Sequence, residues 1–487
     1  MKKLLSILIL SLLSLVCVRA QEDNFRSRYE DFRKQAQTSY DSFRRQCNQE
    51  YAEFLKQAWT YFKMGPVMEK PVEEDVPPVV IEEDRDKVPI ENNELPYDEV
   101  VPVPEEVPQP QPVEPIQETP VIDNTGFSFD FFGTPLKIRV DDANKFVLRS
   151  VAPEYVGLAW EKLSGQAYDN MLYDCLAIRD TYKLCDWAYL MMLLNFSAEF
   201  LQTEQEAILL TAFLYCQSGY KMRLGMTEDQ LCLLFGTRHQ IYGAGCYEID
   251  GSFFYPLNCE AKEMQIADTS FPEEKEMSLA MSELPLFARN NTAARSFEAK
   301  GYKTTASCSV NSNLLAFFEC YPTSQLDNNP MTRWALYANT PLDQSIKDQL
   351  YPGLRAAIDG QPRPKALDIL LDFVQTAFEY EYDDKVWGGD RALFAEESLY
   401  YPYCDCEDRS ILFSRLVRDL LGLDVILVYY PGHLATAVKL PELIEGDYLS
   451  LNEENYLVCD PTCIGAPIGM TMPDMDNKTA KVILLKR

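Results

Sequence analysis

Histidine and positive charge are both scarce in this 487-residue sequence. Only two histidines occur, His239 and His433, so a metal site built from several histidines is excluded. Lysine and arginine number 45 against 75 aspartate and glutamate residues, which gives a formal net charge of −30. Because binding to phosphate backbones requires clustered basic side chains, this balance argues against a nucleic-acid partner. After residue 16 no apolar run approaches bilayer-spanning length, so we expect no transmembrane segment in the mature chain.

Residues 1–20 are typical of a cleavable signal peptide. A basic start precedes a short apolar run, residues 4–16, and Val18 and Ala20 suit a signal-peptidase site. An uncleaved membrane anchor is one alternative, although the run is short for that role. A lipoprotein modified at Cys17 is a weaker alternative, because bulky residues precede this cysteine where small ones are normal. We therefore expect a periplasmic or secreted protein.

An eleven-residue aromatic repeat occupies residues 21–64. Eleven residues cover three helical turns, so the apolar positions form a stripe along one long amphipathic helix. A single helix cannot bury such a stripe, and we expect self-association, or docking on a partner helix or membrane surface; packing on the chain's own globular part is the alternative. Each repeat also carries a glutamine after a basic residue, which is either a solvated flank position or an acyl donor. The repeated positions are Tyr29, Phe32 and Ala36, then Tyr40, Phe43 and Cys47, then Tyr51, Phe54 and Ala58, and the glutamines are Gln35, Gln46 and Gln57.

Proline and acidic residues dominate residues 65–125. This segment contains 13 prolines, and its 17 acidic and 3 basic residues give a net charge of −14. Proline fixes φ and like charges repel, so the composition predicts an extended, disordered linker without a core of its own. Nearly half of the chain's excess negative charge therefore lies outside its globular part.

The remaining residues are typical of an α+β protein with two domains, residues 126–340 and 341–487. The first is expected to mix helices and strands. Between Glu206 and His239 the first domain has a predicted helix, a glycine, a strand and a histidine, in the same order as the second domain. The first domain is therefore either a degenerate copy of the second or an unrelated scaffold. The expected elements are a hairpin at 127–140, helices within 154–235, a hairpin at 246–255, strands at 302–310, 313–321 and 334–338, a helix at 366–380, a helix at 406–421, and strands at 424–430, 433–440 and 456–460.

Cys406 stands at the predicted start of a helix. Asp405 is a good N-cap and Asp408, three residues on, favours the amides of the first turn. The helix N-terminus carries positive potential, which stabilises a thiolate over a thiol. The adjacent Glu407 and Asp408 oppose this effect, and they favour a protonated thiol unless a cation compensates them.

His433 and Asp460 complete a constellation suited to thiol catalysis. His433 follows a Pro-Gly turn and begins a strand, and Asp460 ends another; the three residues are 27 positions apart each time. Histidine can accept the thiol proton near neutral pH, and a carboxylate can orient the imidazole. There are two rivals: a buried structural cysteine, and a zinc site whose spacing is unusual. The zinc ligands would be Cys404, Cys406, Cys459 and Cys463.

These segments resemble the transglutaminase-like superfamily, in particular its exported bacterial members. The resemblance covers residues 366–470 and rests on Asp405 to Leu412, on Pro431-Gly432-His433 and on Cys459 to Thr462. It implies a papain-like core, with a nucleophile helix packed on an antiparallel sheet, and a catalytic triad of Cys406, His433 and Asp460. It also implies an upstream donor for the oxyanion, for which Trp387 is the nearest candidate and the backbone N–H of Cys406 another.

The expected function is therefore that of a thiol enzyme acting on amide bonds of peptides or proteins through a thioester on Cys406. Hydrolysis is favoured over cross-linking, because transamidation needs a site that excludes water. No cofactor or metal is implied. The alternative is a catalytically silent binding or scaffold protein with a self-associating N-terminal helix, since the superfamily contains transamidases, peptide hydrolases and inactive members.

Overall fold

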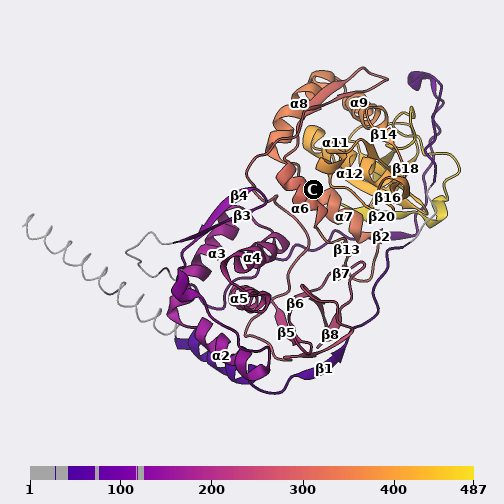
Figure 1. Ribbon diagram of the computed structural model, residues 1–487. Coiled ribbons are helices and arrows are strands. Elements are labelled where there is room, and N and C mark those ends of the chain that lie inside the picture. Colours follow the sequence, from indigo (N-terminus) through magenta and orange to yellow (C-terminus); the bar gives the residue numbers. More distant parts are fainter. Residues whose placement is uncertain (1–27, 29–41, 72–75, 117, 119–125, 487) are drawn as a thin grey trace, which may run out of the picture.

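A computed structural model describes residue 28 and residues 42–71, 76–116, 118 and 126–486. The protein is a mixed α+β chain with two halves, and each half is built on a six-stranded sheet (Figure 1). We call the part around the sheet of residues 222–266 the first half and the part around the sheet of residues 425–484 the second half. The predicted signal peptide and Gln35 lie outside the described residues. Within the described ranges, no helix combines the length and the apolar character needed to cross a bilayer.

The two sheets have the same topology. The strand order is β8-β9-β6-β5-β10-β1 in the first sheet and β18-β19-β17-β16-β20-β2 in the second. Corresponding neighbours pair antiparallel in both, except that edge strand β1 is antiparallel to β10 whereas β2 is parallel to β20. The strands are β1 (Thr60–Lys63), β5 (Met222–Met226), β6 (Leu231–Thr237), β8 (Tyr247–Ile249), β9 (Ser252–Pro256) and β10 (Glu263–Ile266), then β2 (Glu99–Val101), β16 (Val425–Tyr430), β17 (His433–Lys439), β18 (Tyr448–Leu451), β19 (Glu454–Cys459) and β20 (Lys481–Leu484).

A buried helix precedes the first central strand of each sheet and packs on the two central strands. In the first half this helix is α5 (Glu204–Gln217), which contacts β5 and β6; in the second it is α12 (Cys406–Leu421), which contacts β16 and β17. The match in helix position, strand order and strand direction is compatible with a degenerate copy, which the sequence left open beside an unrelated scaffold.

The other helices cover these sheets and fill the space between the halves (Figure 1). The hairpins predicted at 127–140 and 246–255 are confirmed. The helix predicted at 366–380 is present as Arg363–Thr376, and Glu379–Tyr380 is a short strand instead. Short two-stranded pairs, including β3 (Phe127–Phe131) with β4 (Thr134–Ile138), complete the fold. The helices are α2 (Pro153–Leu163), α3 (Asp169–Thr181), α4 (Asp186–Phe200), α6 (Ser312–Glu319), α7 (Thr332–Asn339), α8 (Gln344–Ile358), α9 (Arg363–Thr376), α10 (Asp383–Val386) and α11 (Ala395–Tyr400).

Two predicted strands are wrong. Residues 313–321 and 334–338 lie in helices α6 and α7. Asn311 caps α6 by accepting a hydrogen bond from the backbone N–H of Asn313, a local signal for a helix. Short apolar runs do not distinguish a buried strand from a buried helix by periodicity alone, which explains the error.

The aromatic stripe packs on the chain's own first half. Residues 42–55 are helical, but β1 begins at Thr60, so the long helix predicted to residue 64 ends earlier. Tyr51 and Leu55 are buried, and the ring of Tyr51 lies 4.9 Å from that of Trp160 between centroids. Of the described repeat positions, Cys47 and Tyr51 are buried and Phe54 is partly buried, whereas Phe43 is 45% exposed. The middle of the stripe therefore packs on the chain's own globular part, as in the alternative considered above.

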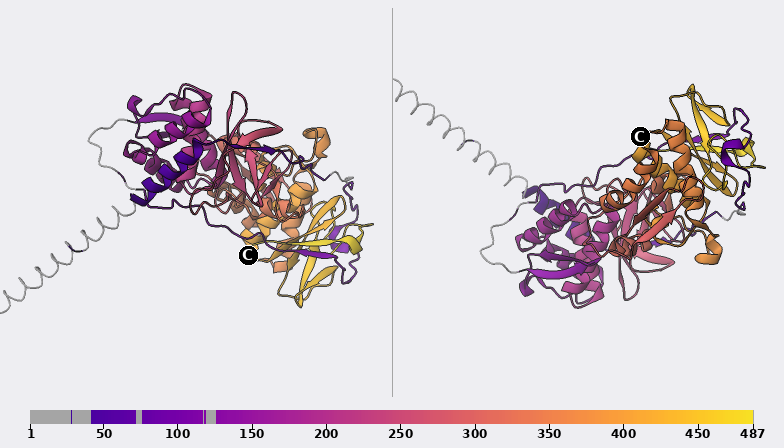
Figure 2. Two further views of the ribbon diagram at one scale, coloured as in Figure 1. Left: turned by 90° about the horizontal axis from the view of Figure 1, so that it is seen from below. Right: turned by 90° about the horizontal axis from the view of Figure 1, so that it is seen from above.

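The proline-rich segment also differs from the free linker that its composition predicts. Residues 76–116 run along the outside of both halves (Figure 2) and contribute β2 to the second sheet. Val101 is fully buried, and the Arg85 guanidinium lies 2.9 Å from a carboxylate oxygen of Asp368 on α9. Backbone pairing at a sheet edge and ion pairs to the body hold a segment that has no core of its own.

Candidate active site

The predicted nucleophile helix begins where the sequence placed it. α12 starts at Cys406, and Asp405 is its N-cap in a reciprocal capping box: the Asp405 carboxylate accepts from the Asp408 N–H and the Asp408 carboxylate accepts from the Asp405 N–H, both at 3.4 Å. Gly422 ends the helix with φ +64°, a conformation that suits glycine. The thiol therefore lies in the first turn of a well-capped helix, with the sheet behind it.

His433 and Asp460 meet at one end of the second sheet. His433 Nε2 lies 2.8 Å from Asp460 Oδ2, and both side chains are buried. The other oxygen of Asp460 accepts hydrogen bonds from the backbone N–H groups of Thr462 and Cys463, at 2.8 Å and 3.2 Å, so the carboxylate is fixed from both sides. His433 Nδ1 is buried and has no hydrogen-bond partner among the described residues. Since Asp460 occupies Nε2, Nδ1 is the nitrogen left to exchange a proton with a reacting group.

The Cys406 thiol is protonated in this arrangement. Its Sγ donates to Glu407 Oε2 at 3.2 Å, and the described side chains of Cys406 and His433 share no hydrogen bond. Burial raises the pKa of Cys406 well above its ordinary value, and the charges of Glu407 and Asp405 raise it further. Burial and the adjacent carboxylates therefore outweigh the helix N-terminus, and together they favour the neutral thiol.

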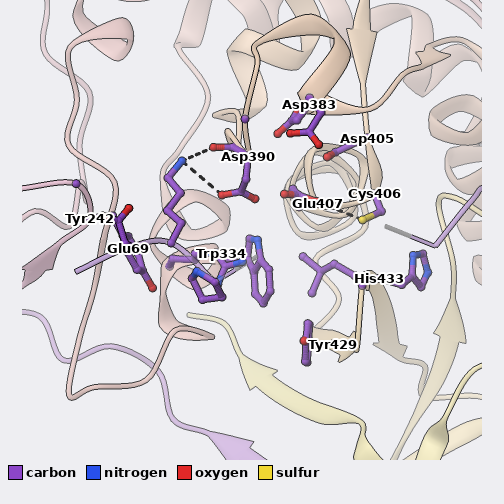
Figure 3. Close-up of a pocket in the computed structure, with 18 residues that line it drawn as sticks. Glu69, Tyr242, Trp334, Asp383, Asp390, Asp405, Cys406, Glu407, Tyr429 and His433 are labelled. Atoms are coloured by element: carbon purple, nitrogen blue, oxygen red, sulfur yellow. Dashed lines mark hydrogen bonds and ion pairs between the residues drawn. The ribbon is translucent and has the colours of Figure 1, made fainter. Parts of the chain in front are cut away.

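Cys406 and His433 open on a common pocket of about 570 Å³ (Figure 3). Its walls come from three parts of the chain: the N-terminal segment, the first half of the molecule, and the second half. Figure 3 shows Glu69 and Tyr242 on the side opposite Cys406, with Trp334 and Tyr429 between. The residues that bear charge or aromatic rings are Glu69, Lys70, Tyr242, Arg333, Trp334, Asp383, Asp384, Asp390, Asp405, Glu407, Tyr429 and His433.

Trp387, the oxyanion donor expected from the sequence, does not line this pocket. Its ring packs against Tyr401 at 4.7 Å between centroids and under the Arg391 guanidinium. Trp334 on α7 does line the pocket, and its Nε1 is buried without a hydrogen-bond partner. Trp334 is therefore the better candidate, and only the position of α7 reveals it.

Two further expectations have clear outcomes. Asp408 is fully buried away from the pocket, and besides capping α12 it accepts a hydrogen bond from the Leu393 N–H at 2.7 Å, so its role is structural support. Among the described residues, the one group of three or more possible metal ligands that includes Cys406 is Asp405, Cys406 and Glu407, and no such group contains two of the four thiols proposed for zinc. The zinc interpretation is wrong for that reason.

Among the described residues, the first half carries no cysteine, histidine and aspartate at the positions that match those of the second half. Matching the two sheets by helix start and strand register puts Glu204, Leu231 and Leu257 where the second half has its cysteine, histidine and aspartate. None of these side chains can act as a nucleophile–base pair.

His239 is a core residue and not a counterpart of His433. It follows β6, whereas His433 begins the equivalent strand. Its Nδ1 lies 3.1 Å from the Ser324 hydroxyl, and its Nε2 accepts from the Leu279 N–H at 3.1 Å. Burial lowers the pKa of His239 to about 3. It is thus a neutral histidine with both nitrogens satisfied.

Comparison with protein-family models, with curated proteins and with solved structures finds no match. What can be said of the protein's class therefore rests on its own geometry, which is an α+β chain with two sheets of one topology and a buried Cys, His and Asp gathered around one of them.

Proposed function

We propose that the protein is an exported thiol enzyme of the transglutaminase-like type that acts on amide bonds of peptides or proteins. One observation carries the proposal: Asp460 holds His433 by Nε2, while the buried Nδ1 remains without a partner in a pocket that also holds Cys406. A nucleophile helix packed on an antiparallel sheet, as in a papain-like core, supports the same conclusion.

The chemistry follows from the roles of the three side chains. His433 Nδ1 takes the thiol proton as Sγ attacks the amide carbon, and the Cys406 N–H and Trp334 Nε1 stabilise the oxyanion. The C–N bond then breaks, and the leaving amine or ammonia takes the proton back from His433. Water, deprotonated by His433, cleaves the thioester and restores the thiol with release of a carboxylic acid.

Hydrolysis is favoured over cross-linking. Transamidation requires that the thioester be shielded from water, and the walls of this pocket carry six acidic side chains, which keep it wet. The role of the repeat glutamines as acyl donors stays a prediction; Gln46 lies on an exposed helix face, where its amide donates to Glu50 at 2.9 Å.

A catalytically silent binding or scaffold protein is the second candidate. The observation that favours it is the hydrogen bond between the thiol and Glu407, together with the raised pKa of Cys406. An active enzyme must break that hydrogen bond when the substrate binds.

The test is acyl transfer in isotopic water. The full-length protein is incubated with a digest of cellular proteins in H₂¹⁸O, with and without hydroxylamine, and products are identified by mass spectrometry. An enzyme gives ¹⁸O-labelled carboxylates, and hydroxamates at the same positions, whereas Cys406→Ser and His433→Ala give neither. Cys404→Ser, which alters the neighbouring buried thiol outside the pocket, retains the activity. Equal products from wild type and Cys406→Ser would establish the silent alternative.

A further inference from the structure

We propose that the acidic wall of the pocket, formed by Asp383, Asp390 and Glu407, binds an ammonium or guanidinium group of the substrate beside the amide that Cys406 attacks. The substrate class would then be peptides or proteins with a basic side chain next to the reacting bond. This inference rests on the proposed function, because it names the substrate of that same site.

The three carboxylates converge beside the thiol. One oxygen from each lies within 4.8 Å of the others, and Figure 3 shows them along one wall that ends at Cys406. Asp383 and Glu407 are each only 7% exposed. At such distances, like charges in a partly buried site repel one another. Burial, and then the charge of Glu407, raise the pKa of Asp383 to about 8, so this wall gains from a bound cation.

The protein's own cations leave most of this wall uncompensated. Within the described part of the chain, neither Asp383 nor Glu407 forms an ion pair with lysine or arginine. Arg391 gives Asp383 only its backbone N–H, and its guanidinium pairs with Glu397 at 2.6 Å. Arg333 stacks on Trp334, 3.9 Å from the ring centroid. Six acidic side chains therefore face Lys70 and Arg333 in this pocket.

Lys70 shows that an ammonium group fits the wall. Its Nζ donates to the main-chain oxygen of Asp390 and lies 3.4 Å from the carboxylate of the same residue (Figure 3). Both side chains are about one-third exposed, at 30% and 35%, so this contact is on the open side of the pocket and can be displaced. Lys70 thus occupies the rim, while the deeper carboxylates remain for a second cation.

Two buried, unpartnered polar atoms indicate where the rest of the substrate lies. His433 Nδ1 and Trp334 Nε1 both belong to residues of the pocket wall, and neither has a hydrogen-bond partner. Buried polar groups normally form hydrogen bonds, so we infer that these two bind polar atoms of a ligand. A peptide with its amide at the thiol and its basic side chain along the acidic wall satisfies both sets of groups.

The test compares two affinity labels that share one reactive group. Lysyl and norleucyl chloromethyl ketones differ by the terminal ammonium, and alkylation of Cys406 in the full-length protein is followed by intact mass and peptide mapping. Each rate is divided by the rate at Cys320, an exposed cysteine in the same chain, to remove intrinsic reactivity. We expect the lysyl label to react about 10-fold faster at Cys406, which corresponds to about 1.4 kcal/mol of cation binding.

Variants distinguish the effect of the acidic wall on the lysyl preference from the effect of the protein's overall negative charge. The lysyl preference falls toward unity in Asp390→Asn and in Glu407→Gln, whereas Asp359→Asn, an equal charge change at an exposed residue outside the pocket, retains it. Equal rates in wild type, with labelling that still depends on His433, would overturn this inference and leave the proposed function standing. Failure of both labels at Cys406 would overturn the two together. Suppression of the lysyl preference by millimolar Ca²⁺ at constant ionic strength would assign the wall to a divalent cation instead.

Discussion

At the residue scale, Glu407 is the charged group with the largest effect on the thiol. Burial raises the pKa of Cys406 most and the charge of Glu407 adds to it, while Glu407 also accepts the hydrogen bond of Cys406 Sγ. A substrate cation on the acidic wall would draw the Glu407 carboxylate away and lower the pKa of Cys406. Binding and activation of the nucleophile are then coupled through one side chain, which gives a resting enzyme with an unreactive thiol.

Glu407→Gln tests this directly. Removing the negative charge lowers the pKa of Cys406, so the rise of iodoacetamide labelling with pH shifts to lower pH. We expect a shift of about one pH unit and, at pH 7, labelling of Cys406 about 10-fold faster than in wild type, since one pKa unit is a factor of ten in thiolate. The rate at Cys406 is read by peptide mapping across pH 6 to 10.

The matched control is Glu453→Gln, which makes the same chemical change at an exposed turn far from the pocket. It should leave the pH profile in place. Slower labelling in Glu407→Gln would mean that this side chain supports the thiolate, contrary to the expectation.

The sequence predicts the three residues of the proposed triad and misses those around them. The chain has only two histidines, so His433, which follows a Pro-Gly turn, is readily chosen as the candidate base. Cys406 is chosen as the candidate nucleophile because Asp405 marks the start of its helix. Trp334 and Lys70 are contributed by segments distant in sequence, and no local pattern marks their approach. Long-range packing, which a single sequence does not encode in motifs, decides which side chains share a pocket.

At the scale of elements, the ends of α12 fix the site. Prediction succeeds here because start and stop signals are local: Asp405 with Asp408 at the beginning, Gly422 at the end, and Gly432 in the next turn. It fails at α6 and α7, where short apolar runs are ambiguous. The capped helix therefore follows from its sequence, whereas the helix carrying Trp334 does not.

Gly422→Ala tests the helix end. The left-handed φ of +64° strains any side chain, although a Cβ there would meet no atom within 4 Å. We expect a loss of about 1 kcal/mol in the free energy of unfolding, from backbone strain alone. Urea unfolding followed by tryptophan fluorescence gives the value. Gly389→Ala is the control, since that glycine has ordinary φ and equally open space, and its stability should stay within about 0.5 kcal/mol of wild type.

At the scale of the whole molecule, one sheet topology occurs twice and one segment joins both halves. Residues before 126 give β1 to the first sheet and β2 to the second, so the N-terminal part completes the edge of each. The same segment brings Lys70 to the pocket. Its composition predicts a linker, because the segment has no apolar core of its own. Its ordered structure comes instead from the strands and side chains with which it pairs.

The aromatic stripe either packs in the core of the chain or forms an interface between copies of the chain. Substitution of Tyr51 distinguishes these two architectures. If the stripe is core, Tyr51→Ala removes a ring packed on Trp160 and Phe271 and lowers the free energy of unfolding by about 3–5 kcal/mol, while the mass measured by sedimentation stays the same. Tyr51→Phe is the matched control, because the hydroxyl is buried without a hydrogen-bond partner and its loss should leave stability unchanged or slightly higher. A wild-type oligomer that Tyr51→Ala dissociates without loss of stability would instead make the stripe an interface between copies of the chain.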